Sequence, residues 1–360
     1  QSKILSMCIG DYSKDPRPRR MINFFLENKF DLYICSDVKK DSRKNFKLDN
    51  LELRNNYDLS SRVKKLFLLI VRKFFPLNSL KNKINEYIYG YHVLKHHIDK
   101  QNYDFIICHD IYLLPLAVFL KNNNKKSKIL FDAREFYPGQ FEDSFLFNLF
   151  EKKERERICK TFFHNCDEII TVSDSISRKY HELFDKKPKV FMSVPVYQDL
   201  KVRSTNDKQI KIVHHGVANK NRKIENMIKI VSQSDDRFSL DLYLTGSKKY
   251  IGKLRSMTDD QRIKIKEPVE FDELVNNLNL YDIGLFYVEP STDNLKYCLP
   301  NKLFEFIQAR LAVMIGPSEE MKKIIENYDC GFVCNEFTLD SCIKLLNSLS
   351  AESIDIKKAN

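Results

Sequence analysis

The stretch PNKLFEF at residues 300–306 places a proline, an amide, a lysine and a carboxylate at the start of a helix-like run. Pro300 suits the first turn of a helix, whose free backbone N–H groups around Asn301 and Lys302 can hold a phosphate. Glu305, one turn further on, can accept hydrogen bonds from hydroxyl groups. A phosphate site beside a hydroxyl site indicates a nucleotide sugar. The stretch fits equally well a helix whose proline and glutamate only favour its start.

Strand-like runs in the same half of the chain end in loops that could contact such a ligand. The run KIVHHG ends at Gly216, where the backbone can approach a ligand closely. Arg222 and Lys223 follow at the start of the next helix-like stretch and can neutralise a diphosphate. Two further loops supply Gly246 in LYLTGS and, for backbone contacts to a nucleobase, Pro268 and Val269 in IKIKEPVEF. Taken singly, each loop also fits an ordinary turn.

The elements that must position these residues are short apolar runs that alternate with helical stretches, the pattern of a parallel, doubly wound α/β sheet. The pattern occurs twice. The first series of expected strands covers residues 3–9, 31–35, 104–108, 128–132 and 168–172, and the second covers 210–214, 239–244, 262–266, 282–287 and 311–315. We therefore predict two Rossmann-like domains, residues 1–197 and 198–360, joined near residues 197–208. The active site is expected in a cleft at the carboxyl ends of the strands, and the last helix can pack back on the first domain.

The order of these features resembles the donor domain of the GT-B glycosyltransferases, in particular the retaining glycosyltransferase family 4, and the resemblance extends over nearly the whole chain. It implies that Lys223, with Arg222 beside it, holds the donor diphosphate. It also implies that Glu305 contacts the ribose hydroxyls and that the segment from Leu299 through Lys302 meets the sugar and phosphate. The chain departs from the family pattern at Val217, where an arginine commonly follows the glycine, and at Tyr297, where a first glutamate is usual.

The N-terminal half carries further parts of the resemblance. FIICHDIYLLPL places His109 after a strand, as in the family's motif, which implies that His109 hydrogen-bonds the donor sugar and stabilises the transition state. A histidine at this place otherwise serves as a structural cap. KILFDAREFYPGQ resembles an acceptor-site pattern, with Arg134 in place of the usual histidine and Glu135 beside it. The acceptor candidates in the loop GDYSKDPRPRR are Asp15, Arg17 and Arg19. A solvated basic loop would explain that stretch equally well.

No D-x-D triplet occurs in the sequence, so the paired carboxylates with which a GT-A enzyme holds its divalent ion are missing. We predict that the reaction needs no metal or cofactor. Arg222, Lys223 and the backbone amides around Asn301 would stabilise the leaving diphosphate. The resemblance implies retention of configuration. The expected donor is a UDP-sugar, and the expected acceptor is a glycan or lipid-linked glycan of bacterial surface polysaccharide synthesis, such as capsule or lipopolysaccharide.

Two other functions stay open. A nucleotide-sugar epimerase uses the same scaffold, but it would need additional acid and base carboxylates that the sequence does not identify. A nucleic-acid-binding protein fits the pI near 9.0. The basic residues do not alternate with aromatic residues in a recognisable module, however, and we predict no nucleic acid partner. A dinucleotide oxidoreductase is disfavoured because GxGxxG follows none of the expected strands.

Positive charge concentrates in the first half of the chain. Residues 1–200 carry 36 Lys and Arg against 26 Asp and Glu, whereas residues 201–360 carry 24 against 23. Residues 62–83, RVKKLFLLIVRKFFPLNSLKNK, hold seven basic residues and no acidic one. This segment is either an amphipathic helix that lies on an anionic membrane or a core helix with one solvated basic face, broken at Pro76.

The nine cysteines lie mostly in apolar, strand-like runs and form no pairs with CxxC spacing. Reduced core thiols of this kind favour the cytoplasm over an oxidising compartment. No apolar run approaches the length of a membrane span. We therefore expect a cytoplasmic protein, with peripheral attachment to the inner face of the cell membrane as an option.

Overall fold

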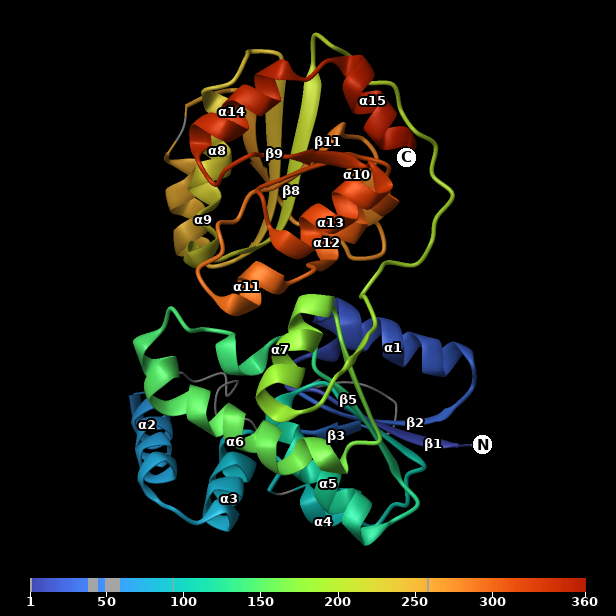
Figure 1. The fold of residues 1–360 in the computed structure, drawn as a ribbon, viewed down its shortest axis with the longest axis vertical. Helices are drawn as coiled ribbons and strands as arrows, with labels where there is room; N and C mark the ends of the chain where they lie inside the picture. Colours follow the sequence, from blue (N-terminus) through green and yellow to red (C-terminus); the bar gives the residue numbers. More distant parts are fainter. Residues whose placement is uncertain (1, 38–44, 49–58, 93, 258) are drawn as a thin grey trace. The chain divides into compact units, whose positions relative to one another are not determined.

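The computed structural model describes residues 2–37, 45–48, 59–92, 94–257 and 259–360. The chain divides into two compact units (Figure 1). The first contains residues 1–192 together with 292–294, and the second contains residues 193–291 and 295–360. Each unit is a parallel sheet with helices packed against it, which confirms the predicted α/β architecture of two doubly wound domains.

The first unit is built on a seven-stranded sheet with the order β3-β2-β1-β4-β5-β6-β7. Its strands are β1 (Lys3–Met7), β2 (Asp31–Ser36), β3 (Asn45–Lys47), β4 (Phe105–Cys108), β5 (Lys128–Asp132), β6 (Glu168–Thr171) and β7 (Lys189–Val190). Its helices are α1 (Pro16–Glu27), α2 (Leu59–Phe74), α3 (Asn78–Ile88), α4 (Lys95–Ile98), α5 (Leu114–Asn123), α6 (Lys152–Phe162) and α7 (Asp174–Phe184). The parallel register sets Met7 beside Cys108 and Cys108 beside Phe131, so the carboxyl ends of β1, β4 and β5 lie together.

The second unit is built on a six-stranded sheet with the order β10-β9-β8-β11-β12-β13. Its strands are β8 (Ile210–Ala218), β9 (Phe238–Gly246), β10 (Ile263–Lys266), β11 (Ile283–Phe286), β12 (Ala312–Ile315) and β13 (Gly331–Val333). Its helices are α8 (Ile224–Ser232), α9 (Lys248–Arg255), α10 (Leu274–Leu278), α12 (Asn301–Gln308), α13 (Glu319–Tyr328), α14 (Leu339–Ser348) and α15 (Ala351–Ala359). The short helix α11 (Asp293–Tyr297) begins in the segment 292–294 that groups with the first unit and ends in the second. The last helix, α15, packs on β12 and β13 of its own unit.

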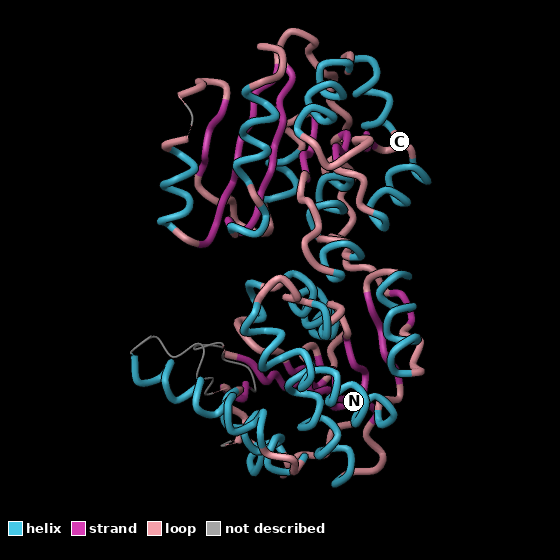
Figure 2. Tube along the Cα trace, turned by 60° about the vertical axis from the view of Figure 1, so that its left-hand side comes forward, coloured by secondary structure: helices cyan, strands magenta, loops and turns pink. Residues whose placement is uncertain are grey.

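The central strands read as continuous apolar runs because helices cover both faces of each sheet (Figure 1, Figure 2). In the second unit the side chains of β11 and β12 are all buried, as sheet residues between two helical layers should be. The ten strands expected from the sequence all form, with ends shifted by a few residues. The strands β3, β7 and β13 were not predicted, since each spans only two or three residues.

The basic segment at residues 62–83 forms most of α2, a break in the helix around Pro76 and the first half of α3. The alternative of a core helix with a solvated basic face is wrong. Arg72, one of the seven basic residues of the segment, is buried at 1% exposure, whereas several of the large apolar side chains of α2 are exposed. Within the described ranges, no helix has the length and apolar character needed to span a membrane.

Candidate active site

Gly216, near the end of β8, lies directly against the side chain of Lys302. Its backbone has φ +125°, and a Cβ atom there would lie 2.6 Å from Cε and 2.7 Å from Nζ of the lysine. Carbon atoms do not approach other heavy atoms this closely, so any side chain at position 216 would displace Lys302. Glycine therefore allows the lysine to rest on the backbone at the carboxyl end of β8.

Lys302 belongs to the first turn of α12, and Pro300 caps this helix in an extended conformation. The lysine is only 8% exposed. Burial, and then the positive charge of Arg222, lower the pKa of its ammonium group to about 7, while Glu305 acts in the opposite direction. The Nη1 atom of Arg222 is 3.8 Å from the Cβ position of Gly216. Two cations thus meet at the glycine, and an anion bound there would offset their repulsion.

Glu305 is buried one turn further along α12, at 3% exposure. Its Oε2 atom lies 3.4 Å from Nε2 of His215, the residue before the glycine. Burial and the charge of Lys302 lower the pKa of His215 well below its usual value, so the imidazole is neutral near pH 7. The Nε2 atom is buried without a hydrogen-bond partner in the described part of the chain. The site therefore combines a carboxylate with a neutral imidazole beside the two cations.

His214, the other histidine of KIVHHG, makes a different contact. Its Nδ1 atom lies 2.8 Å from the backbone carbonyl oxygen of Leu285 on the neighbouring strand β11. Burial, followed by the charge of Lys302, lowers its pKa to about 3, which keeps the ring neutral. A neutral ring can donate from Nδ1 to that carbonyl, so this histidine ties β8 to β11.

The sequence paired Arg222 and Lys223 as ligands of one diphosphate, but Lys223 forms its ion pair with an acidic side chain rather than at Gly216. Lys223 adopts the left-handed conformation with φ +44° at the start of α8. Its Nζ atom lies 3.0 Å from Oε2 of Glu289, and both side chains are about half exposed. The cation that accompanies Arg222 at Gly216 is instead Lys302. A direct contact between Lys223 and a diphosphate stays a prediction.

The other residues predicted to bind the donor lie at or after the carboxyl ends of β9 and β10 or beside the start of α12. Gly246 ends β9 with φ +104°, and its Cβ position is 3.2 Å from Cγ1 of Val217. Pro268 and Val269 follow β10, the first exposed and the second half-buried. Leu299 is buried in the apolar core before α12. The side chain of Asn301 accepts a hydrogen bond of 2.8 Å from Ser193 Oγ.

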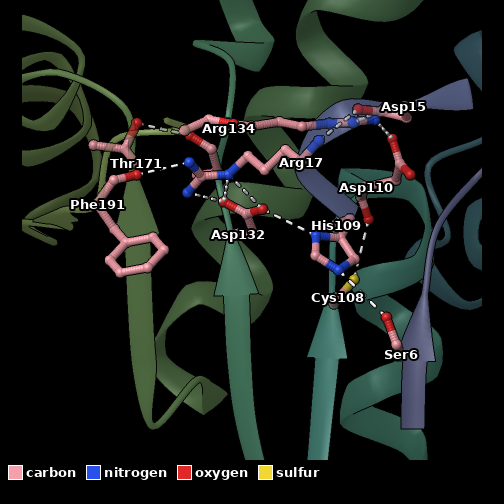
Figure 3. Close-up of polar contacts among 12 residues, drawn as sticks. Ser6, Asp15, Arg17, Cys108, His109, Asp110, Asp132, Arg134, Thr171 and Phe191 are labelled. Carbon is pink, nitrogen blue, oxygen red and sulfur yellow. Dashed lines mark hydrogen bonds and ion pairs between the residues drawn. The ribbon is translucent and has the colours of Figure 1, made fainter. Parts of the chain in front are cut away.

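In the first unit, His109 is fully buried and does not face solvent (Figure 3). Its Nδ1 atom is 2.9 Å from Asp132 Oδ2, and its Nε2 atom is 3.3 Å from Ser6 Oγ. Both ring nitrogens are therefore occupied within the protein. The prediction that His109 hydrogen-bonds the donor sugar stays a prediction, and the ring would have to give up one of these contacts to do so.

Asp132 also binds Arg17, one of the expected acceptor residues. The Nε atom of Arg17 lies 2.8 Å from each carboxylate oxygen, and Nη2 lies 2.7 Å from Oδ1 (Figure 3). Burial alone would raise the pKa of Asp132, but hydrogen bonds and charge from His109 and Arg17 hold it well below its usual value. The guanidinium is itself buried at 5% exposure. The guanidinium of Arg17 is thus bound to partners inside the unit.

Arg134 makes ion pairs with Asp15 and with Asp110, the latter at 3.1 Å (Figure 3). Asp15 also caps α1 by accepting a hydrogen bond from the backbone N–H of Arg17. The structure therefore brings together Asp15, Arg17, His109 and Arg134 at the carboxyl ends of β1, β4 and β5. Each of these side chains is held by a protein partner of opposite charge or by a hydrogen bond.

The remaining two acceptor candidates lie nearby in the chain but play other local roles. Arg19 is partly buried in the first turns of α1, and its backbone N–H donates to Asp15 O at 3.1 Å. Glu135 accepts a hydrogen bond from Asn294, in the short segment that groups with the first unit. Their predicted contacts with an acceptor stay predictions.

Sequence reasoning missed His215, Ser6 and Asp132. His215 precedes Gly216 directly in KIVHHG, and a polar residue at a strand's carboxyl end is a visible signal. Asp132 ends the predicted strand 128–132 and offered the same signal. Ser6 lies within β1 and could not have been found, because its contact with His109 depends on the register of β1 against β4. Within the described ranges, no three His, Cys, Asp or Glu side chains gather closely enough to hold a metal ion.

No family model and no curated protein sequence matches the chain. Solved structures do match its fold. Anabaena Alr3699/HepE, solved in complex with UDP and glucose, has a TM-score of 0.67 at 10% sequence identity, covering 100% of this chain and 94% of that one. WaaG, a glycosyltransferase involved in lipopolysaccharide biosynthesis, has a TM-score of 0.65 at 9% identity, covering 99% and 92%. A putative UDP-N-acetylglucosamine 2-epimerase from Listeria monocytogenes has a TM-score of 0.57 at 11% identity, covering 99% and 91%.

The fold is therefore the two-domain α/β arrangement of the GT-B glycosyltransferases. At these levels of identity the likeness concerns the fold alone. Structures with this fold include complexes with UDP and with UDP-glucose.

Proposed function

We propose that this chain is a glycosyltransferase that moves a sugar from a nucleoside-diphosphate donor, a UDP-sugar by preference, to a glycan or lipid-linked acceptor. The observation that carries the proposal is the meeting of Arg222 and Lys302 at Gly216, with Glu305 one helical turn beyond the lysine. Two cations beside a helix N-terminus suit a diphosphate, and the buried carboxylate suits ribose hydroxyls.

The proposed reaction needs few groups from the protein. An acceptor hydroxyl attacks the anomeric carbon, a new C–O bond forms, and the bond from that carbon to the diphosphate oxygen breaks. The leaving diphosphate carries the released charge and takes the proton of the acceptor. Arg222 and Lys302 would stabilise that charge, so the proposal requires no metal ion or cofactor. Retention of configuration is proposed from the resemblance to glycosyltransferase family 4.

The proposed acceptor belongs to bacterial surface polysaccharide synthesis, and the proposed sugar is a hexose. The positive charge of the first half of the chain supports an acceptor that carries phosphate or lies in a membrane. We include in the proposal a location in the cytoplasm, with peripheral attachment to the inner face of the cell membrane.

A thermal-shift panel of UDP-, GDP-, ADP- and CMP-sugars tests the donor site. A ligand at 100 times its dissociation constant adds about 2.7 kcal/mol to the free energy of unfolding. We expect UDP-sugars to raise the melting temperature most, with and without a chelator. Absence of a shift with every nucleotide sugar would contradict the proposal.

A second candidate is a non-hydrolysing nucleotide-sugar epimerase, which the fold likeness to the putative Listeria epimerase favours. The two enzymes differ in whether they need an acceptor. An epimerase converts the nucleotide sugar alone, which NMR of the anomeric protons would show. A glycosyltransferase leaves the configuration of the donor sugar unchanged until an acceptor is added.

A further inference from the structure

Helix α2 presents its apolar side chains outward. Val63, Leu66, Phe67, Ile70 and Phe74 are all exposed, with Phe67 at 63% and Phe74 at 74%. At 100° per residue these five positions fall within an arc of about 100° on one side of the helix. We call them the α2 stripe. Ordinary surface helices turn such a stripe toward the core.

Arg72 on the opposite side of α2 fixes this orientation. Its Nη1 atom donates to Asn85 Oδ1 at 2.7 Å, and its Nη2 atom donates to the Phe150 carbonyl oxygen at 3.0 Å and to Glu151 Oε1 at 2.9 Å. The arginine is 1% exposed. Turning the stripe inward would remove Arg72 from these partners and take from the mostly buried Glu151 carboxylate the cation that lowers its pKa most. The packing of α2 therefore holds the α2 stripe on the outside of the unit.

Basic residues border the stripe on both sides. On the helical wheel, Arg62 and Lys73 lie next to one edge and Lys64 lies beyond the other, and all three are exposed. Residues 59–85 contain no acidic side chain. Beyond the helix, Phe75 and Leu77 on either side of Pro76 extend the exposed apolar surface. Long basic side chains beside an apolar stripe can reach lipid headgroups while the stripe lies among acyl chains.

The charge pattern indicates which kind of partner binds the α2 stripe. A second copy of the chain, packed symmetrically through the stripe, would bring Arg62, Lys64 and Lys73 of both copies toward like charges. An anionic bilayer supplies an apolar layer and negative headgroups together. We propose that α2 lies flat in the headgroup region of an anionic membrane, with the α2 stripe facing the acyl chains. The proposal deepens the membrane-attached acceptor of the proposed function, but its test requires no sugar transfer.

The chain has no tryptophan, so a single introduced tryptophan reports on one position. We would place it in the stripe as Phe67→Trp and, as a matched control, on α1 as Phe24→Trp, since Phe24 is also exposed, at 57%. Both proteins are titrated at low salt with vesicles of phosphatidylcholine, either alone or with about a third phosphatidylglycerol. Expected are a blue shift and quenching by brominated lipid for Phe67→Trp with the anionic vesicles only. An unchanged Phe67→Trp spectrum, or an equal shift for Phe24→Trp, would overturn the proposal.

Removal of apolar surface supplies a second measurement. The double variant Phe67→Ser/Phe74→Ser should lower vesicle partitioning roughly 10-fold or more relative to the wild type, while Phe24→Ser should leave it unchanged. Because these side chains are exposed, the melting temperature should stay close to that of the wild type. Two results would contradict the proposal. The double variant could partition onto vesicles as strongly as the wild type, or the wild type could self-associate and the double variant not. Vesicle binding without any response to UDP-sugars would leave this inference standing and contradict the proposed function.

Discussion

The cluster around Asp132 and the site around Gly216 both gather charged side chains at the carboxyl ends of parallel strands, but their charges are balanced differently. In the first unit, Arg17 is paired with Asp132, and Arg134 with Asp15 and Asp110. In the second unit, Lys302 is buried with its pKa lowered to about 7, partly because Arg222 is near. The charges of the first arrangement are paired within the protein, whereas we expect an added anion to stabilise the second.

This comparison separates stability from ligand binding. A group that completes an internal network should matter most for folding, because its loss leaves a buried charge behind. A group that waits for a ligand carries a cost in the free protein and should matter most for binding. Substitutions in the two regions therefore test whether the first cluster mainly stabilises the fold and the second mainly binds a ligand.

The largest expected effect is on stability, from Asp132→Asn. This change leaves the buried guanidinium of Arg17 without its carboxylate and should lower the free energy of unfolding by about 3–5 kcal/mol. Denaturation by urea, followed by circular dichroism, measures it. The control is Glu168→Gln, which breaks the exposed pair with Lys189 and should cost less than about 1 kcal/mol. Equal losses of unfolding free energy in the two variants would contradict the stabilising role of the buried Arg17–Asp132 pair.

Arg222→Ala should mainly affect binding. Loss of one charge-assisted contact to the diphosphate should weaken UDP binding by roughly 10- to 100-fold. Calorimetric titration with UDP measures this effect. Lys223→Ala is the matched control, since the neighbouring lysine already faces Glu289, and it should change the affinity less than about 3-fold. A larger loss with Lys223→Ala would instead support the prediction from the sequence that Arg222 and Lys223 together hold the diphosphate.

Gly216→Ala should have a smaller effect on UDP affinity, roughly 10-fold. The new methyl group would occupy the place of the Lys302 side-chain end and would strain a backbone with φ +125°. Because the lysine is flexible, it can move aside and lose only part of its interaction. UDP titration of this variant beside Gly252→Ala, whose Cβ position is open, measures the difference. Unchanged affinity would show that the lysine need not rest on Gly216.

The free protein should also become more stable as pH rises through the range in which Lys302 titrates. Its folded pKa of about 7 lies below the ordinary value of 10.5, so the unfolded chain binds more protons between these two values. The contribution of this group to the free energy of unfolding therefore increases from pH 7 toward pH 10. Comparing the wild type with Lys302→Met by urea denaturation at several pH values isolates that contribution. An identical pH dependence of the two proteins would contradict the lowered pKa.

The sequence predicted the fold well because each central strand is a continuous apolar run flanked by helical periodicity. It also placed Lys302 and Glu305 in the first turns of a helix, because PNKLFE marks a helix start, and the structure has both residues buried there. It could not tell which of Arg222 and Lys223 turns toward Gly216, since that depends on the left-handed conformation at 223. Nor could it orient α2. Amphipathic spacing defines an apolar face but not the side to which it turns, and here the buried contacts of Arg72 decide it.

The most direct test of the two-cation site is the number of protons taken up when UDP binds. In the free protein at pH 8, Lys302 is mostly neutral, and the pKa values of His214 and His215 are too low for them to contribute. A bound diphosphate raises the pKa of the lysine, so binding should take up close to one proton, and the affinity should fall as pH rises above 7. Calorimetric titration in buffers of different ionisation enthalpy gives the number. We expect about one proton for the wild type and about zero for Lys302→Met. Binding of UDP without proton uptake, or equal uptake by both proteins, would contradict the account.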